Sequence, residues 1–310
     1  MSLPNCRVVP LPDQQVSFVI GGRERCRWHY GPNAPRPFFF PFVGPCGEPL
    51  TRMGHPGAPN HDHHRSIWFA HEKVLGINFW GDQSTARIRQ QTWLAYEDGD
   101  DECRMAVQLG WYDGHDPQPL LKQDLIAAVR PGVEGETFLE LQSTFSPLAE
   151  SLEFGKTNFG FLAVRVAKSV SEHFGGGKLT NSERAVGEPA IFGHPARWMD
   201  YSGPISSGRD EQPDVIEGIT YFDHPRNPGF PNSWHVRADG WMGCSPCMGG
   251  PLTTKKSEPL RLQFLLHAHA GEASAERSNA IAEQFAALLP FEVIKANVPH
   301  VTFQIRRSEV

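Results

Sequence analysis

Residues 97–111 read EDGDDECRMAVQLGW and join a turn to a clear strand pattern. From Cys103 to Trp111 every second side chain is apolar, which places these side chains on one face of an extended segment. The acidic residues 97–101 that precede them surround Gly99 and are typical of an exposed hairpin turn. Residues 86–97, ARIRQQTWLAYE, are expected to be extended as well. The stretch therefore predicts an antiparallel hairpin.

Similar patterns recur along the chain and predict its fold class. Further strands are expected at 16–20, 26–30, 36–50 (an irregular edge strand), 121–130, 137–145, 159–168, 196–201, 219–223, 233–238, 259–269 and 300–306. One helix is expected at 273–289, with Ser274 as its cap and Pro290 at its end. A parallel α/β fold would need helices between the strands. The pattern instead predicts an all-β fold, a large antiparallel β-sandwich with a C-terminal helix.

Composition narrows the kind of protein. The 310 residues are expected to form a single domain, residues 1–310, and the 39% hydrophobic content suffices for a large core. The net charge is −6 and the 29 basic residues form no dense run, so neither nucleic acid nor an anionic membrane is an expected partner. No apolar run approaches ~18 residues and no secretory signal is visible, which indicates a cytoplasmic protein. The six cysteines have no framework spacing and are interpreted as structural.

The first candidate for a functional site is the stretch 59–80, PNHDHHRSIWFAHEKVLGINFW. It places His61, His63 and His64 close together and continues into an apolar segment that ends in Trp80. Histidine transfers protons near neutral pH and is the commonest metal ligand. If residues 61–65 are extended, His61, His63 and Arg65 share one face. The stretch is expected to form one wall of a site.

Further segments also combine polar and aromatic side chains. They are 153–160 with Lys156, 197–203 with Asp200, 223–237 with Asp223, His224, Trp234, His235 and Arg237, and the weaker pair His267 and His269. His235 and Arg237 are two residues apart, so a strand there would place both on one face.

A family resemblance rests on several of these segments. HDHHRSIWFAHEKVLGINFW, LEFGKTNFGFLAVRV, GKLTNS, HPARWMDYSG and GITYFDHPRNPGFPNSWHVRADG occur in the expected order within residues 37–270. Together they resemble the soluble "methane oxygenase PmoA" family, a domain of unknown function of the DUF6807 type. The resemblance implies a β-supersandwich similar to that of galactose mutarotases and related carbohydrate-active proteins, and a likeness of fold does not by itself set function. The segment GWMGCSPCMGG departs from the usual family ending, which affects substrate details near residues 240–250.

The leading functional hypothesis is a carbohydrate site that works by acid–base chemistry, as an epimerase, lyase or hydrolase. Opening or epimerising a sugar ring needs an acid and a base on opposite sides of one atom, which His with Asp can supply. The candidate catalytic residues are His61, His63, His64, His224, His235 and Asp223. The candidate substrate-binding residues are Arg65, Trp80, Lys156, Asp200, Trp234 and Arg237, since flat aromatic faces suit sugar rings and charged groups bind hydroxyls.

Three alternatives remain open at this stage. His61 and His63, joined by Asp223 with His224 or His235, could hold a divalent metal such as Fe, Zn or Cu in an oxygenase or hydrolase. A sugar-binding module without catalysis would use the same side chains. The histidines could also form a hydrogen-bonded structural cluster. An oligomer is possible on any of these hypotheses.

Overall fold

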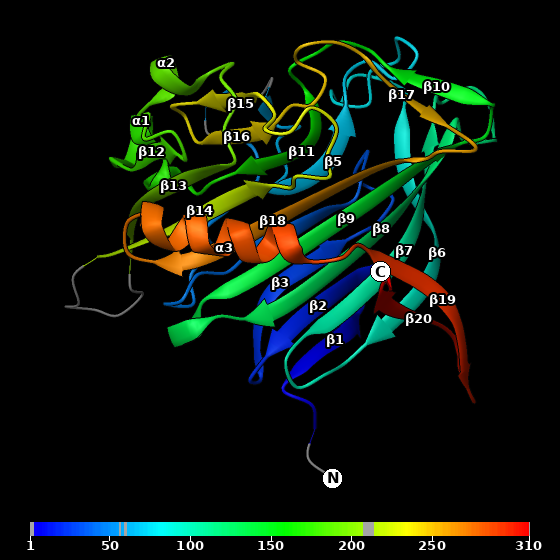
Figure 1. Cartoon of the computed structure of the whole chain (residues 1–310), viewed down its shortest axis with the longest axis horizontal. Coiled ribbons are helices and arrows are strands. Elements are labelled where there is room, and N and C mark those ends of the chain that lie inside the picture. The colour runs from blue at the N-terminus through cyan, green and yellow to red at the C-terminus, as the bar shows by residue number, and fades with distance from the viewer. Residues whose placement is uncertain (1–2, 56, 59–60, 207–213, 310) are drawn as a thin grey trace.

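The computed structural model describes residues 3–55, 57–58, 61–206 and 214–309, so Pro59 and Asn60 of the histidine stretch lie outside the described residues. Two antiparallel eight-stranded sheets pack face to face (Figure 1). The first sheet contains, in spatial order, β1 (Cys6–Leu11), β2 (Gln15–Ile20), β3 (Arg23–His29), β4 (Phe38–Phe42), β5 (Ile67–His71), β11 (Gly160–Arg165), β16 (Trp241–Cys244) and β15 (Trp234–Arg237). The predicted β-sandwich is confirmed.

The second sheet contains, in spatial order, β12 (Lys178–Asn181), β13 (Trp198–Ile205), β14 (Val215–Asp223), β18 (Leu260–Ala270), β9 (Thr137–Pro147), β8 (Leu121–Pro131), β7 (Cys103–Tyr112) and β6 (Arg87–Glu97). Two small sheets pair β10 (Ser151–Phe154) with β17 (Leu252–Lys255) and β19 (Phe291–Val298) with β20 (Val301–Arg307). The helices are α1 (Glu172–Gly175), α2 (Glu188–Ile191) and α3 (Ala275–Ala287), with 3-10 turns at Val133–Gly135 and Lys168–Val170.

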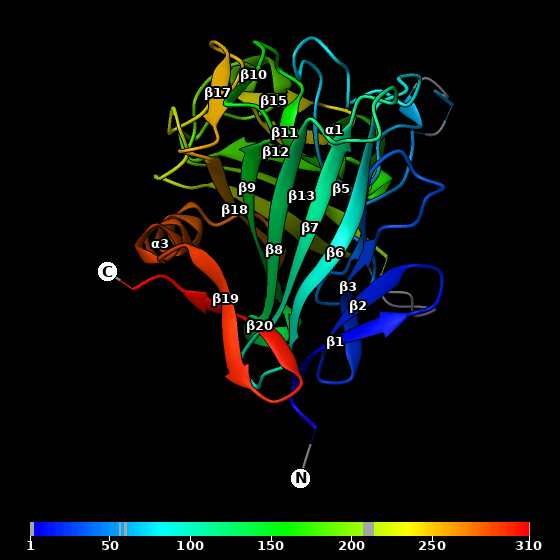
Figure 2. The same ribbon diagram turned by 90° about the vertical axis from the view of Figure 1, so that its right-hand side faces the viewer.

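The hairpin predicted around residues 97–111 is confirmed. Strands β6 and β7 pair antiparallel, with Glu97 opposite Arg104. The apolar face of β7 enters the core between the sheets, which extends through residues of both. The opposite face is also covered, because Ala106 packs beneath Phe291 and Ile305 of the β19–β20 hairpin. Figure 2 shows this hairpin crossing the ends of β6, β7 and β8.

The predicted C-terminal helix is confirmed as α3. The hydroxyl of Ser274 accepts a hydrogen bond from the backbone N–H of Arg277 at 3.3 Å, which caps the first turn. Ile281 and Phe285 pack on the outer face of the second sheet. Among the described residues, no helix has the length and apolar character needed to span a bilayer.

Two local predictions are wrong. Strand β4 is not an edge strand, since it lies between β3 and β5, although it pairs with β5 only at Phe39 opposite Ile67. Residues 61–65 are not extended either. The backbone N–H of His61 donates to Ala58 O at 2.8 Å and that of His64 donates to His61 O at 3.0 Å, so the histidines follow a turn. Because these hydrogen bonds join residues three apart, the side chains of this segment do not alternate between two faces as they would in a strand.

Candidate active site

A cavity of about 430 Å³ opens on the outer face of the first sheet. Its volume lies within the range of roughly 300–1,000 Å³ that is typical of small-ligand sites. It is lined by His61, His63, His64, Glu72, Asn78, Trp80, Gly81, Phe159, Arg165, His235, Arg237, Asp239 and Trp241.

The strand pleat explains which residues reach this cavity. In β15, Trp234 and Val236 enter the core, so His235 and Arg237 point to the other face. In β16, Met242 enters the core and its neighbour Trp241 faces the cavity. The prediction that His235 and Arg237 share a face is therefore confirmed. The loops before and after β5, the segment before β11, the end of β11 and the turn between β15 and β16 supply the remaining walls.

Three tryptophans form an aromatic cluster at the cavity. The ring centroids of Trp80 and Trp241 are 5.3 Å apart, and Trp68 lies 5.6 Å from Trp80 and 5.3 Å from Trp241. All three indoles are buried, and none of their N–H groups has a hydrogen-bond partner in the described part of the chain. Buried indole N–H groups usually find an acceptor. The cluster thus gives the cavity an apolar wall through Trp80 and Trp241, while its indole N–H groups are buried without an acceptor in the described part of the chain.

His235 is held in one orientation by its surroundings. Its Nδ1 lies 3.2 Å from the backbone carbonyl oxygen of Asn158, while the Asn158 side-chain amide is farther away, at 3.4 Å. A carbonyl can only accept, so Nδ1 carries the hydrogen and Nε2 is left as an acceptor. The ring also packs edge-on against Phe159 and Phe192. Burial and the nearby Arg237 guanidinium lower the pKa of His235 to about 4, so the ring is neutral at pH 7.

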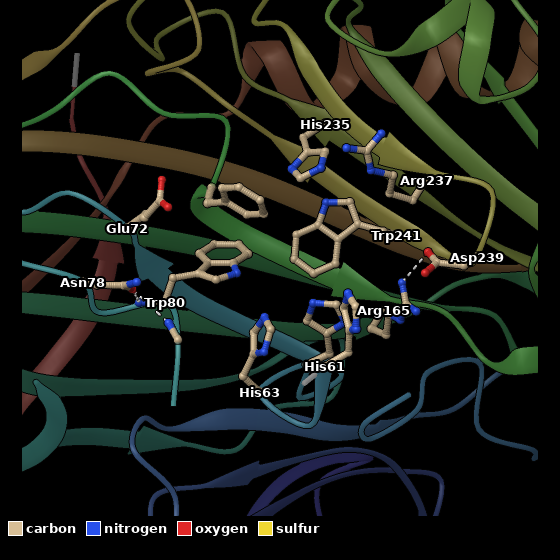
Figure 3. Close-up of a pocket in the computed structure, with 13 residues that line it drawn as sticks. His61, His63, Glu72, Asn78, Trp80, Arg165, His235, Arg237, Asp239 and Trp241 are labelled. Atoms are coloured by element: carbon tan, nitrogen blue, oxygen red, sulfur yellow. Dashed lines mark hydrogen bonds and ion pairs between the residues drawn. The ribbon is translucent and has the colours of Figure 1, made fainter. Parts of the chain in front are cut away.

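The facing wall carries the three clustered histidines. Figure 3 shows His61 and His63 across the cavity from His235 and Arg237, with the rings of Trp80 and Trp241 between them. The ring centroids of His63 and His64 are 4.3 Å apart. His64 is buried, and its Nδ1 has no partner among the residues that the structure describes. Burial and then the Arg165 charge hold the pKa of His64 well below its usual range.

An ion pair closes one end of the cavity. Arg165 is almost fully buried, and its Nη1 donates to Asp239 Oδ1 at 2.7 Å. Its Nη2 contacts Nδ1 of His55, which Arg52 also approaches at 3.3 Å. Burial alone would raise the pKa of Asp239, but the hydrogen bond and charge of Arg165 outweigh it and lower this pKa. The Arg165 charge is therefore compensated within the protein.

The other end of the cavity carries a second carboxylate. Figure 3 places Glu72 at the end opposite Asp239. The hydroxyl of Thr157 donates to Glu72 Oε2 at 2.5 Å. Nearby, Asn78 Oδ1 accepts from the backbone N–H groups of Trp80 at 2.7 Å and Gly81 at 2.9 Å. Asn78 can therefore offer a ligand its Nδ2 donor.

Comparison with known sequences assigns this architecture to a family. The profile of DUF6807, described as a family of unknown function, matches residues 15–283. The chain belongs to the DUF6807 family. The match gives no support to the methane oxygenase name. No curated protein matches this DUF6807 chain. Among solved structures, that of a proposed mutarotase (YeaD) from Salmonella typhimurium is similar, with 12% identity, a TM-score of 0.33, and coverage of 86% of this chain and 95% of that chain.

Half of the residues predicted for the site line the cavity of this DUF6807 protein. They are His61, His63, His64, Trp80, His235 and Arg237. Lys156 lines an adjoining pocket. Arg65 does not line the cavity. Its Nη2 donates to Asp82 Oδ2 at 2.7 Å, and Asp82 also pairs with the buried Arg36, so this ion-pair group holds the loop that carries Trp80.

Asp223 and His224 do not line the cavity either. Both are buried at the end of β14, where Asp223 is the last residue of the strand and His224 follows it. The carboxylate of Asp223 accepts hydrogen bonds from the backbone N–H of His224 and the side-chain amides of Asn227 and Asn232. His224 Nε2 contacts the carbonyl oxygen of Phe285 at 3.2 Å, beneath α3. These contacts organise a loop rather than a ligand site.

Asp200 and Trp234 are likewise buried away from the cavity. Asp200 lies on the outer face of the second sheet, where its Oδ2 is 2.7 Å from His269 Nε2 and accepts from Thr220 Oγ1 at 2.7 Å. Trp234 packs in the core, and its indole N–H donates to Ala196 O at 2.8 Å. The polar atoms of both side chains therefore have partners within the protein: side chains of β14 and β18 for Asp200, and a carbonyl before β13 for Trp234.

Seven residues that line the cavity were not predicted from the sequence: Glu72, Asn78, Gly81, Phe159, Arg165, Asp239 and Trp241. Arg165 lies between Val164 and Val166 within the predicted strand 159–168, so a charged side chain at that position was the available signal. Asp239 lies in the turn after β15, and Trp241 is the first residue of β16, a strand that was not predicted.

The residues suggested as metal ligands do not come together in the described part of the structure. Within the described ranges, no group of three or more His, Cys, Asp and Glu side chains is placed to hold a metal ion. The ring centroids of His61 and His63 are 6.0 Å apart. Asp223, which was to complete the set, lies outside the cavity.

Proposed function

We propose that the cavity binds a carbohydrate and transfers protons on its ring. The observation that carries this proposal is the pairing of the Trp80–Trp241 aromatic cluster with the neutral, oriented imidazole of His235. A pyranose has flat C–H faces and a rim of hydroxyls, so it suits a cavity with aromatic faces and convergent polar groups. The family is one of unknown function, so the geometry is the support for this assignment.

Binding divides between the two kinds of side chain. The sugar ring packs against Trp80 and Trp241, which line the cavity. Asn78 Nδ2 and the Glu72 carboxylate add a donor and an acceptor at one end.

Proton transfer needs groups on opposite sides of the ring. Nε2 of His235 takes the proton of the anomeric hydroxyl, and a histidine of the facing wall, His61 or His63, gives a proton to the ring oxygen. The bond between the anomeric carbon and the ring oxygen breaks and leaves an open-chain aldehyde. Reversal after rotation of the carbonyl yields the other anomer, with both protons returned.

The experiment measures anomer exchange directly. Two-dimensional NMR exchange spectra of glucose, galactose and mannose are recorded at pH 7 with and without catalytic amounts of protein. The proposal predicts faster exchange between the α and β signals of at least one sugar. Saturable binding with no change in exchange for any sugar would contradict the catalytic part of the proposal.

A sugar-binding module without catalysis is the second candidate, and one observation favours it. A pKa of about 4 makes His235 a weak base at pH 7, whereas efficient general bases have pKa values near the working pH. The exchange experiment separates the two, since a module binds sugars without accelerating exchange.

A further inference from the structure

A second pocket of about 600 Å³ adjoins the cavity and shares Glu72 with it. We infer that this second pocket binds an anionic group on the sugar, a carboxylate or a phosphate. The inference rests on the proposed function and specifies its substrate class: the sugar ring occupies the first cavity, and its acidic substituent, or an acidic residue linked to it, occupies the second.

The wall between the two pockets is the segment that orients His235. Asn158, which accepts the hydrogen bond of His235 Nδ1, lines the second pocket, and its neighbour Phe159 lines the first. Phe192 contacts the His235 ring and lines the second pocket. The proton-accepting imidazole and the Glu72 carboxylate therefore both lie where the pockets meet. A ligand that spans them places its reacting ring beside both groups.

The charges of the two pockets differ. In the first, Arg165 is paired with Asp239 and Arg237 with Glu188, at 2.7 Å in each case. The second carries Lys73 and Lys156, and neither makes an ion pair among the residues that the structure describes. Both lysines are exposed in a chain of net charge −6. Two uncompensated ammonium groups beside a single carboxylate favour an anion.

The lysines are held near each other by the backbone. The N–H of Gly155 donates to the carbonyl oxygen of Lys73 at 2.7 Å, and Val74 pairs with Phe154 across the same two segments. The N–H of Lys73 also donates to Nδ1 of the buried His71 at 3.1 Å. The two side chains therefore start from fixed positions.

The test compares neutral and anionic forms of the same sugar. The full chain is titrated by calorimetry at low salt with glucose, galactose and mannose, with their uronates and with their 6-phosphates. Inorganic phosphate alone is a further ligand. The proteins are wild type, the Lys73→Gln/Lys156→Gln double variant and Lys295→Gln, whose exposed lysine lies on the distant β19 hairpin.

Wild type is expected to bind one anionic series about tenfold more tightly than its neutral series, and added salt is expected to reduce this ratio. The series with the larger ratio identifies the anion. The double variant is expected to bring the ratio close to one, and Lys295→Gln to retain it. A wild-type ratio near one, or a ratio that survives in the double variant, would overturn the inference.

Failure of the proposed function gives a different pattern. If neutral sugars bind and the anionic forms bind no more tightly, only the inference falls. If no sugar of any series binds, both fall. Inorganic phosphate that binds as tightly as every sugar phosphate would reveal an anion site without a sugar cavity, and would also overturn both.

Discussion

The Nδ1 atom of His235 lies 3.2 Å from the backbone carbonyl oxygen of Asn158. This contact, made from β15 to the segment before β11, fixes the ring and leaves Nε2 as the proton acceptor. Sheet pairing through β16 holds both strands in register, with His235 opposite Gly243 and Leu162 opposite Cys244. The sandwich therefore positions the imidazole through long-range strand pairing.

His235→Asn is expected to abolish anomer exchange while sparing the fold. The asparagine amide can still donate to the Asn158 carbonyl, but it lacks a group at the position of Nε2. Exchange should slow by about 100-fold or more, the usual scale for losing a general base. NMR exchange and thermal unfolding are measured on the same samples. His194→Asn, at an exposed histidine, is the control, and an His235→Asn variant with wild-type exchange would exclude the proposed base.

Trp241→Phe is expected to weaken sugar binding. Trp241 contacts Trp68, Trp80, His64 and His235, so the smaller ring removes part of the surface on which the sugar packs. We expect the affinity for the sugar to fall about five- to tenfold and the free energy of unfolding to fall by about 1–2 kcal/mol. Calorimetric titration measures the affinity.

The matched control for that variant is Trp93→Phe, since Trp93 packs against Tyr30 and Tyr96, away from the cavity. It should lose stability without losing affinity. Equal loss of sugar affinity in both variants would mean that Trp241 acts only through stability.

Asp200→Asn is expected to destabilise the protein most at low pH. Burial lowers the pKa of His269, but the charge of Asp200 and their hydrogen bond outweigh it and raise this pKa. A raised pKa in the folded state contributes stability below the unfolded value of ~6.5, and this contribution is lost as pH rises through the folded pKa. The substitution should lower the free energy of unfolding by about 3–5 kcal/mol at pH 6 and by less at pH 9. Urea unfolding measures both. Weaker sugar binding with unchanged stability would instead support a substrate-binding role for Asp200.

The wild-type protein is expected to lose stability as pH falls from 7 to 5. Burial lowers the pKa of His71 to about 3. Burial together with a nearby arginine lowers the pKa of His224 to about 4 and that of His235 to about 4. The unfolded chain protonates these rings near pH 6.5 and the folded chain does not. Each ring that binds a proton only in the unfolded chain lowers the free energy of unfolding by about 1.4 kcal/mol for every unit by which the pH falls. His269 has the opposite effect, because its pKa is raised in the folded protein. Urea unfolding at pH 7, 6 and 5 checks this, and constant stability would contradict it.

Much of the fold could be predicted because its signals are local. The alternation from Cys103 to Trp111 and the Ser274 cap depend only on neighbours in the sequence, and both elements form as expected. The same holds for the shared face of His235 and Arg237, because β15 is a regular strand. The prediction that His61 and His63 share one face of a strand is wrong, because hydrogen bonds of a turn hold this segment and its backbone is not extended.

The complete cavity could not be predicted because it depends on long-range pairing. Arg165 meets Asp239 only after β11, β16 and β15 align, and no spacing in the sequence encodes that contact. Conversely, Asp223 and Asp200 carry suitable chemistry, but their strands direct them to buried hydrogen-bond partners. Residue type identified candidates, and sheet topology selected among them.

Whether this cavity binds a carbohydrate can be measured by saturation-transfer difference NMR of glucose, galactose and mannose. We expect the ring C–H protons of at least one sugar to gain signal with wild-type protein, because they lie against the Trp80 and Trp241 indoles, and to lose most of that signal with the Trp80→Phe/Trp241→Phe variant. If no sugar receives transfer, or if the transfer is unchanged in this folded variant, the cavity is not a carbohydrate site.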